Sequence, residues 1–197
     1  MLEMVKGCQV PFPEKLGEGY KMEERMITAN VGAGKLRQAV ENFIAMHASE
    51  RLFFILEIPT NQKEEPEPEK VLHKDVYYLD GCSRKKALGI LEDYGELLIQ
   101  DGVSAFGFGC QETGDEIMVE KYNILTLWSR RRLEKYRAFF EKLDIGEREE
   151  LVTAWDTFEQ QHPGRTRLYT LEGKSIYDLP EAMKSQGLYF AERREDR

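Results

Sequence analysis

Cysteine, long apolar runs and excess positive charge are all scarce in this chain of 197 residues. The three cysteines, Cys8, Cys82 and Cys110, are an odd number, lie far apart and form no C-x-x-C pair. This pattern argues against a disulfide framework and a thiolate zinc site, and it favours a reducing compartment. The first thirty residues lack the apolar run of a secretory signal, and no run approaches the length of a membrane span. We therefore expect a cytoplasmic protein that does not insert into a membrane.

Acidic residues outnumber basic residues in both parts of the chain, whose formal net charge is −8. Residues 1–100 contain 17 acidic and 13 basic side chains and the remainder contains 19 and 15, so each part has a net charge of −4. A nucleic-acid-binding protein needs a concentrated basic face. The one basic cluster, Arg130 to Arg132 with Lys135 and Arg137, is interleaved with acids and is typical of a solvated helix face. No nucleic acid partner is expected.

The composition that is present is that of a globular protein, with 41% hydrophobic residues, 10 Phe and 9 Tyr. A chain of this length buries about 70% of its unfolded surface. Residues 1–22 combine prolines and glycines without apolar periodicity, which predicts a loosely ordered lead-in. Residues 23–197 are expected to form a single α+β domain. Glutamates alternate with prolines from Glu64 to Glu69, which predicts an exposed acidic connection over residues 61–70.

The apolar spacing predicts helices over 35–48 and 83–100, and Ser83 is the expected N-cap of the second. It also predicts a helix that begins at Ser129 and buries Leu133, Tyr136, Phe140 and Leu143. Strands are expected at 25–31, 52–58, 75–79 and 103–109, followed by one long strand over 116–128 that pairs back as a hairpin. A short helix and a last strand end the chain, at 180–186 and 188–191. The order predicts a layered α+β domain with strand-helix-strand units and a mostly antiparallel or mixed sheet.

The strand Val103 to Gly109 has one bulky face and one nearly bare face, because its period of two separates the two phenylalanines from Ala105, Gly107 and Gly109. A helix packed tightly on the glycine face is the interpretation we favour. The alternative is a small-ligand-binding protein or enzyme that uses this face. The additional lining residues proposed for that site are Tyr122, Asn123, Trp155 and Asp156.

Cys82 is the best candidate nucleophile, because it lies at a predicted helix start with three basic residues close behind it. It lacks a recognisable general base, so a small buried hydrophobe is the simpler interpretation.

The remaining polar motifs favour structural roles. Gly32-Ala33-Gly34-Lys35 lacks the first glycine and the hydroxyl of a phosphate loop. Asp156, Glu159 and His162 would spread around a helix axis rather than converge on a metal. His47 extends an apolar helix face and is interpreted as a partly buried, hydrogen-bonded histidine. Asp115 and Glu116 are interpreted as turn residues. No metal and no cofactor is expected.

Six short segments carry a resemblance to other proteins: Tyr77-Tyr78-Leu79-Asp80-Gly81, the Phe-Gly-Phe-Gly strand, Gly114-Asp115-Glu116-Ile117, Lys121-Tyr122-Asn123, Thr153-Ala154-Trp155-Asp156 and Ala191-Glu192-Arg193-Arg194. They resemble a family of small bacterial proteins to which no activity is assigned. The resemblance covers most of the chain from about residue 25 and implies a bacterial intracellular protein. It implies no cofactor and no catalytic residue.

The sequence therefore favours a non-enzymatic acidic protein that binds another protein. One concrete hypothesis is an immunity or antitoxin-type protein that masks a basic partner, because the negative charge is even and acidic segments occur at Glu64 to Glu69 and Asp144 to Glu150. The rival class is the ligand-binding protein or enzyme described above. The oligomeric state has no sequence signature.

Overall fold

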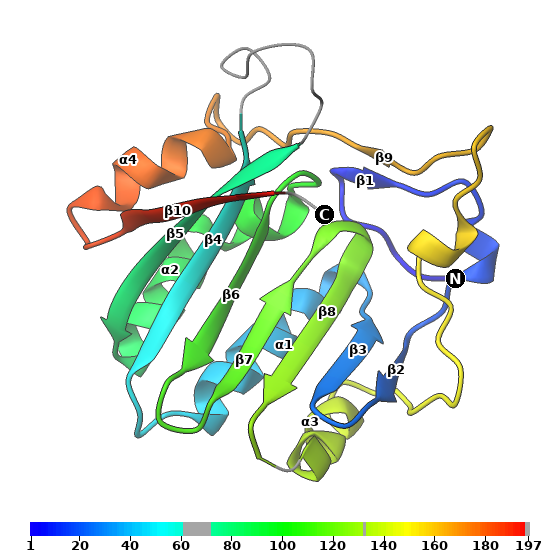
Figure 1. Cartoon of the computed structure of the whole chain (residues 1–197), viewed down its shortest axis with the longest axis horizontal. Helices are drawn as coiled ribbons and strands as arrows, with labels where there is room; N and C mark the ends of the chain where they lie inside the picture. The colour runs from blue at the N-terminus through cyan, green and yellow to red at the C-terminus, as the bar shows by residue number, and fades with distance from the viewer. Residues whose placement is uncertain (61–71, 132, 196–197) are drawn as a thin grey trace.

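The computed structural model describes residues 1–60, 72–131 and 133–195, and it has an α+β fold built on one large antiparallel sheet (Figure 1). Across the sheet the strands are β10 (Tyr189–Glu195), β5 (His73–Cys82), β4 (Leu52–Pro59), β6 (Ala105–Cys110), β7 (Asp115–Val119), β8 (Ile124–Ser129), β3 (Met26–Asn30) and β2 (Gly19–Met22). Every neighbouring pair in this order is antiparallel. A separate two-stranded ladder joins β1 (Cys8–Gln9) to β9 (Arg165–Thr166).

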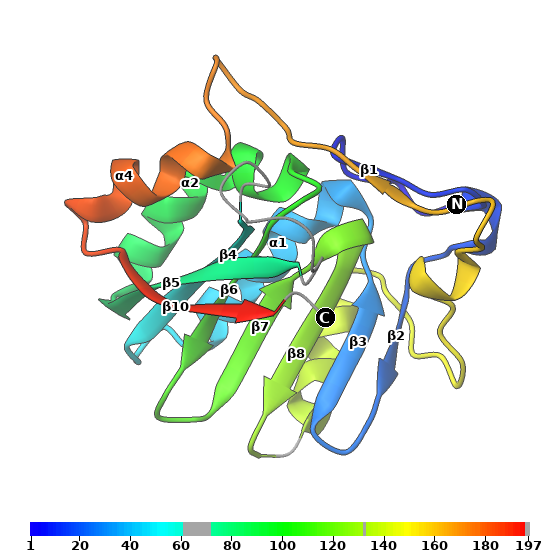
Figure 2. The same ribbon diagram turned by 45° about the horizontal axis from the view of Figure 1, so that its top comes forward.

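Two long helices, α1 (Ala33–Met46) and α2 (Arg84–Gln100), cover one face of the large sheet and leave the other face turned away from them (Figures 1 and 2). Two short helices, α3 (Arg137–Glu141) and α4 (Leu179–Lys184), lie toward the two sides of the sheet. α1 packs on β6 and β7, whereas α2 packs on β4 and β5. No helix in the described part of the chain is long and apolar enough to cross a membrane.

Both long helices form where the apolar spacing predicts them. The predicted stripe of α1 is fully buried: Leu36, Ala39, Val40, Phe43 and Ile44. At the start of α2 the Ser83 side chain accepts a hydrogen bond from the Lys86 backbone N–H at 3.3 Å, so Ser83 is the expected N-cap. One continuous core lies between these helices and the sheet.

The face of β6 that meets the helices is the one with the phenylalanines. Phe106 and Phe108 are buried in the core, and the Phe108 ring lies 5.2 Å from that of Phe54 on β4. Gly107 and Gly109 alternate with them and therefore point to the opposite side. The expectation that a helix packs on the glycine face is wrong, because both long helices need the large apolar surface that only the phenylalanine face offers.

Two other expectations differ from the structure for local reasons. The long strand expected over 116–128 is two strands, β7 and β8, because Tyr122 and Asn123 adopt left-handed backbone angles with φ of 62° and 63° and turn the chain between them. The helix expected from Ser129 is shortened, since Ser129 still belongs to β8. The four positions predicted to be buried there are nevertheless buried: Leu133, Tyr136, Phe140 and Leu143.

Residues 1–22 are more integrated than their composition suggests. Leu2, Val5 and Leu16 are buried, the Leu2 backbone N–H donates to the Leu16 carbonyl, and β2 adds an edge strand to the large sheet. The bond from Leu2 to Leu16 joins the two parts of this segment and β2 pairs with the next strand, β3, and neither contact produces an apolar periodicity in the sequence. The acidic connection expected over residues 61–70 lies outside the described residues.

Candidate functional site

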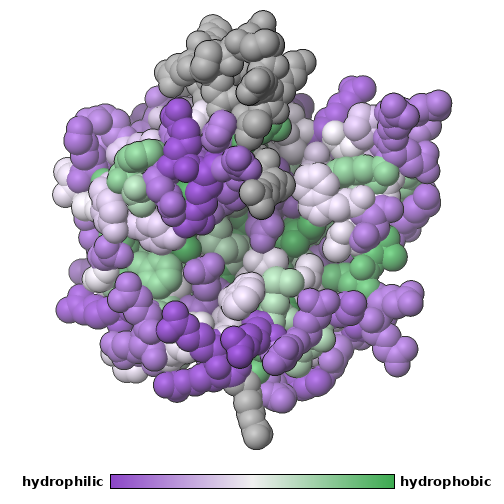
Figure 3. Space-filling view, viewed as in Figure 1, coloured by the Kyte–Doolittle hydropathy of each residue, from purple (hydrophilic) through white to green (hydrophobic). Residues whose placement is uncertain are grey.

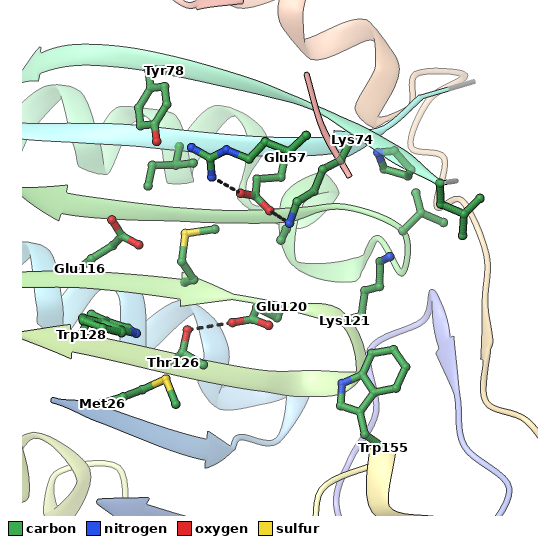
Figure 4. A pocket seen from close by; sticks show the side chains of 17 residues that line it. Met26, Glu57, Lys74, Tyr78, Glu116, Glu120, Lys121, Thr126, Trp128 and Trp155 are labelled. Carbon is green, nitrogen blue, oxygen red and sulfur yellow. Dashed lines mark hydrogen bonds and ion pairs between the residues drawn. The ribbon is translucent and has the colours of Figure 1, made fainter. Parts of the chain in front are cut away.

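The open face of the sheet is hollowed. A depression with a volume of about 680 Å³ lies over β3 to β8, and Figure 3 shows an apolar centre between hydrophilic rims on this face. The close-up in Figure 4 shows side chains from several strands pointing into it. The lining residues are Met26, Ile55, Glu57, Pro59, Leu72, Lys74, Tyr78, Val103, Ala105, Glu116, Met118, Glu120, Lys121, Thr126, Trp128, Trp155 and Arg194. We call this depression the sheet hollow.

Atoms of the neighbouring strands lie directly over Gly107 and Gly109, where a side chain would otherwise be. An added Cβ at Gly109 would lie 2.2 Å from Cζ of Phe53, and one at Gly107 would lie 2.0 Å from the carbonyl oxygen of Ile117 and 2.5 Å from Sδ of Met118. Those contacts are closer than atoms can approach, so only glycine permits this packing. Because the two glycines have no side chains, Met118 and Phe53 can lie across the middle of the open face, close to the backbone.

Three carboxylates face the sheet hollow, and they differ in their partners. Glu57 pairs with Lys74 at 2.5 Å and with Arg194 at 3.6 Å. Glu120 accepts a hydrogen bond from Oγ1 of Thr126 at 2.8 Å. Glu116, by contrast, has no hydrogen bond or ion pair with any residue that the structure describes.

Burial acts on two of these carboxyl groups. It raises the pKa of Glu116 and of Glu120, and the nearby negative charge of Glu57 raises both further. The charge of Arg194 opposes part of the rise at Glu116, and the Thr126 hydrogen bond and the charge of Lys74 oppose part of the rise at Glu120. The charged form is disfavoured because water is partly excluded while compensation is incomplete. A cation entering the sheet hollow would remove that penalty.

Two tryptophans are exposed in the sheet hollow. The Trp128 side chain stands directly across from Glu116 in the β7–β8 pairing and is 49% exposed. Trp155 is 55% exposed and begins a short 3₁₀ helix, Trp155–Thr157, outside the sheet. In Figure 4 the two indoles lie at opposite ends of the labelled residues.

The proposed ligand residues of the sequence analysis occupy different places. Trp155 lines the sheet hollow, and its ring rests edge-on against the buried ring of Tyr122 with centroids 5.0 Å apart. Asn123 is buried, and its side chain forms hydrogen bonds with the backbone of Glu3, Val5 and Val31. Asp156 accepts hydrogen bonds from the backbone and hydroxyl of Thr153, both at 2.8 Å, and these bonds lower its pKa. Tyr122, Asn123 and Asp156 thus support the fold around Trp155.

Cys82 is buried, with its Sγ 3.4 Å from the Leu79 carbonyl oxygen. Burial raises the pKa of its thiol to about 11, against the smaller opposing effect of the Lys86 charge. The group is therefore almost entirely a neutral thiol at pH 7, and this environment does not activate a nucleophile.

The carboxylates of the sheet hollow lie outside the candidate sites predicted from the sequence, although the sequence contains a signal for them. Glu116, Met118 and Glu120 alternate with Ile117 and Val119, which predicts one polar and one apolar face for the strand. Glu57 is a single charge inside the apolar run of β4. Period-two alternation, applied to both strands, places all three carboxylates on the face away from the core.

Comparison with known proteins adds no relative to this picture: no family model, no curated protein and no solved structure matches the chain.

Proposed function

We propose that this protein is a non-enzymatic acidic binding protein of the bacterial cytoplasm, and that its sheet hollow receives a basic segment of another protein. An immunity or antitoxin-type protein masks a basic partner in this way. The observation that carries the proposal is the Glu116 carboxylate, which is partly desolvated, makes no hydrogen bond or ion pair with any described residue, and lies beside the exposed ring of Trp128.

A basic side chain supplies what this arrangement lacks. A guanidinium or ammonium group that binds Glu116 would form a charge-assisted hydrogen bond and would restore the compensation lost by burial. The same cation could stack on Trp128, since the face of an indole attracts positive charge. Arginine fits best, because its planar group stacks on an aromatic ring and pairs with a carboxylate at once.

A protein segment fits the sheet hollow better than a single small molecule. Exposed tryptophans are typical anchors of protein interfaces, and here they lie at opposite ends of the depression (Figure 4). An extended chain can contact both, with its basic residue at the Trp128 end, where Glu116 lies. The net charge of −8 would also speed encounter with a basic partner.

A small-ligand-binding protein or enzyme is the second candidate. Its supporting observation is the volume of the sheet hollow, about 680 Å³, which falls within the range of small-molecule sites. The ligand would again be an organic cation, for the reason given by Glu116.

Binding can be measured through intrinsic fluorescence, because the chain contains only two tryptophans and both line the sheet hollow. We expect an arginine-rich peptide to change their emission saturably, whereas a polyglutamate peptide should have no effect. Glu116→Gln should weaken the peptide at least tenfold, the loss expected when one charge-assisted contact is removed. Glu112→Gln removes the same charge from the exposed turn between β6 and β7 and is the matched control.

The outcomes separate the two candidates. Equal weakening by Glu116→Gln and Glu112→Gln would reduce the interaction to general charge attraction and would contradict a specific site. If arginine ethyl ester alone bound as tightly as the peptide, the small-ligand interpretation would replace the protein partner.

Glu116→Gln should also stabilise the fold. Because the folded-state pKa of Glu116 is raised, its ionisation opposes folding above that pKa, and the effect disappears as the pH falls below the unfolded value. We expect the variant to gain about 1 kcal/mol in unfolding free energy at pH 7, near the lower cost of an unpaired buried polar group, and to match the original protein at pH 3.5. Urea denaturation at both pH values tests this expectation, and a gain that is equal at the two values would contradict it.

A further inference from the structure

A second group of reactive side chains lies on the helix side of the sheet, away from the sheet hollow. Ligand-type atoms of His47, Glu50 and Cys110 all lie within 4.8 Å of one another. None of these residues lines the sheet hollow, and the proposed function does not use them. His47 and Cys110 are buried, whereas the Glu50 side chain is 23% exposed.

The fold brings the three residues together from two separate places. His47 is the C-cap of α1, and the Glu50 backbone N–H donates to its carbonyl at 3.1 Å, which closes the turn that carries both side chains. Cys110 is the last residue of β6 and pairs with Leu52, two residues beyond Glu50. The end of the helix and the end of the strand thus meet at one point.

Of two distances between the ligand-type atoms, one already fits tetrahedral zinc coordination and the other is too short for it. Sγ of Cys110 lies 3.4 Å from Oε2 of Glu50, close to the separation of about 3.5 Å between sulfur and oxygen ligands on one tetrahedral zinc ion. Nδ1 of His47 lies 2.5 Å from the same oxygen, and tetrahedral coordination needs about 3.3 Å. Glu50 is the partly exposed member, so its carboxylate has room to turn.

A fourth residue, Asp115, places a carboxylate behind the imidazole, on the side where metal-binding histidines have one, although Nε2 of His47 makes no hydrogen bond to it in this structure. Nε2 of His47 faces Oδ2 of the buried Asp115 at 3.4 Å. Asp115 is itself held by the hydroxyl of Ser129 at 2.5 Å and by Lys135. A carboxylate behind one ring nitrogen directs the lone pair of the other toward the metal. Nδ1, which points to Glu50 and Cys110, is the nitrogen left for coordination.

We propose that His47, Glu50 and Cys110 bind a zinc ion, with Asp115 as the positioning residue for the imidazole. Nitrogen, oxygen and thiolate sulfur together are a ligand set typical of Zn²⁺. Binding would convert the Cys110 thiol to a thiolate and release its proton to solvent. Three protein ligands leave one position for water, on the side where Glu50 reaches the surface.

Calorimetric titration of the metal-free protein with Zn²⁺ tests the proposal. We expect one ion per chain, and we expect Cys110→Ser and His47→Gln each to weaken binding at least tenfold. The matched controls are Cys82→Ser, which alters an equally buried thiol, and His162→Gln, which removes an exposed imidazole beside Glu159. Both controls should bind as the original protein does.

Cobalt gives a second readout, and its result for the original protein does not depend on the stability of any variant. Co²⁺ bound to a thiolate has a charge-transfer absorption in the near ultraviolet, so the original protein and Cys82→Ser should show it and Cys110→Ser should not. Absence of this band in the original protein, or undiminished Zn²⁺ affinity in a folded Cys110→Ser variant, would overturn the proposal. His47, Glu50 and Cys110 would then be a hydrogen-bonded cluster that needs no ion.

Discussion

Replacing Gly107 by alanine should lower the free energy of unfolding by about 3 kcal/mol, the upper end of the cost of overpacking. The new Cβ would lie 2.0 Å from the carbonyl oxygen of Ile117 on the adjacent strand. A backbone atom in the middle of a sheet cannot move aside without disturbing the hydrogen bonds on both sides of it. Chemical denaturation monitored by circular dichroism, compared at constant slope, measures the loss.

Two other glycines give the controls for this experiment. At Gly109 the nearest atom is the ring end of Phe53, which can rotate, so Gly109→Ala should cost only about 1 kcal/mol. Gly89 in α2 has nothing within 4 Å of an added Cβ, and Gly89→Ala should stabilise the protein by about 0.5–1 kcal/mol. Equal effects at Gly107 and Gly109 would show that the close approach of Ile117 is not what requires glycine.

Asn123→Ala should be at least as damaging, with an expected loss of about 3–5 kcal/mol. The Asn123 side chain joins three segments: its Oδ1 accepts from the Val5 backbone N–H at 3.0 Å, and its Nδ2 donates to the carbonyls of Glu3 and Val31, both at 2.9 Å. The residue is buried and its φ is 63°, a backbone conformation that asparagine tolerates better than alanine. The variant would leave buried polar groups unpaired and would strain the turn.

Two further substitutions divide this loss into its parts, and the same denaturation measurements apply. Asn123→Gly keeps the left-handed turn but loses the hydrogen bonds, so it should recover only the strain, about 1 kcal/mol. Asn123→Asp keeps the acceptor for Val5 and lacks the two donors. If Asn123→Gly were as stable as the original protein, the three hydrogen bonds would contribute nothing measurable, contrary to our expectation.

Asn123 also shows what could be predicted from the sequence and what could not. The sequence places it only among the residues proposed to line a site at the glycine face. Nothing local reveals that its partners are Glu3, Val5 and Val31, which are distant in sequence. The same long-range contacts order residues 1–22, which composition alone describes as loose.

The elements whose residues repeat with a clear period were predictable. The apolar stripes of α1 and α2 and the alternating face of β6 follow directly from their spacing, and the α+β class follows from their order. The period of two in β6 fixes which residues share a face, but it does not say which face the helices cover. That choice depends on the total apolar area offered by neighbouring strands such as β4, whose Phe54 and Leu56 are buried on the side of Phe106 and Phe108.

The candidate site was only partly accessible to the same reasoning. Trp155 was selected, whereas Glu116 was interpreted as a turn residue because it follows the Gly114 turn. Its raised pKa arises first from burial and then from the negative charge of Glu57, which another strand contributes. A pKa shift of this kind is a property of the assembled sheet.

The position of β10 has a consequence for the synthesis of the chain. β5 is made early, yet its outer edge pairs only with β10, which ends the described chain at Glu195. During translation the outer N–H and C=O groups of β5 therefore stay unpaired until more than a hundred further residues have been added. An unpaired strand edge of this kind can pair with a second nascent chain. Loss of β10, by a premature stop or by proteolysis, would leave that edge of β5 open permanently. Aggregation is thus the expected fate of chains that lack β10.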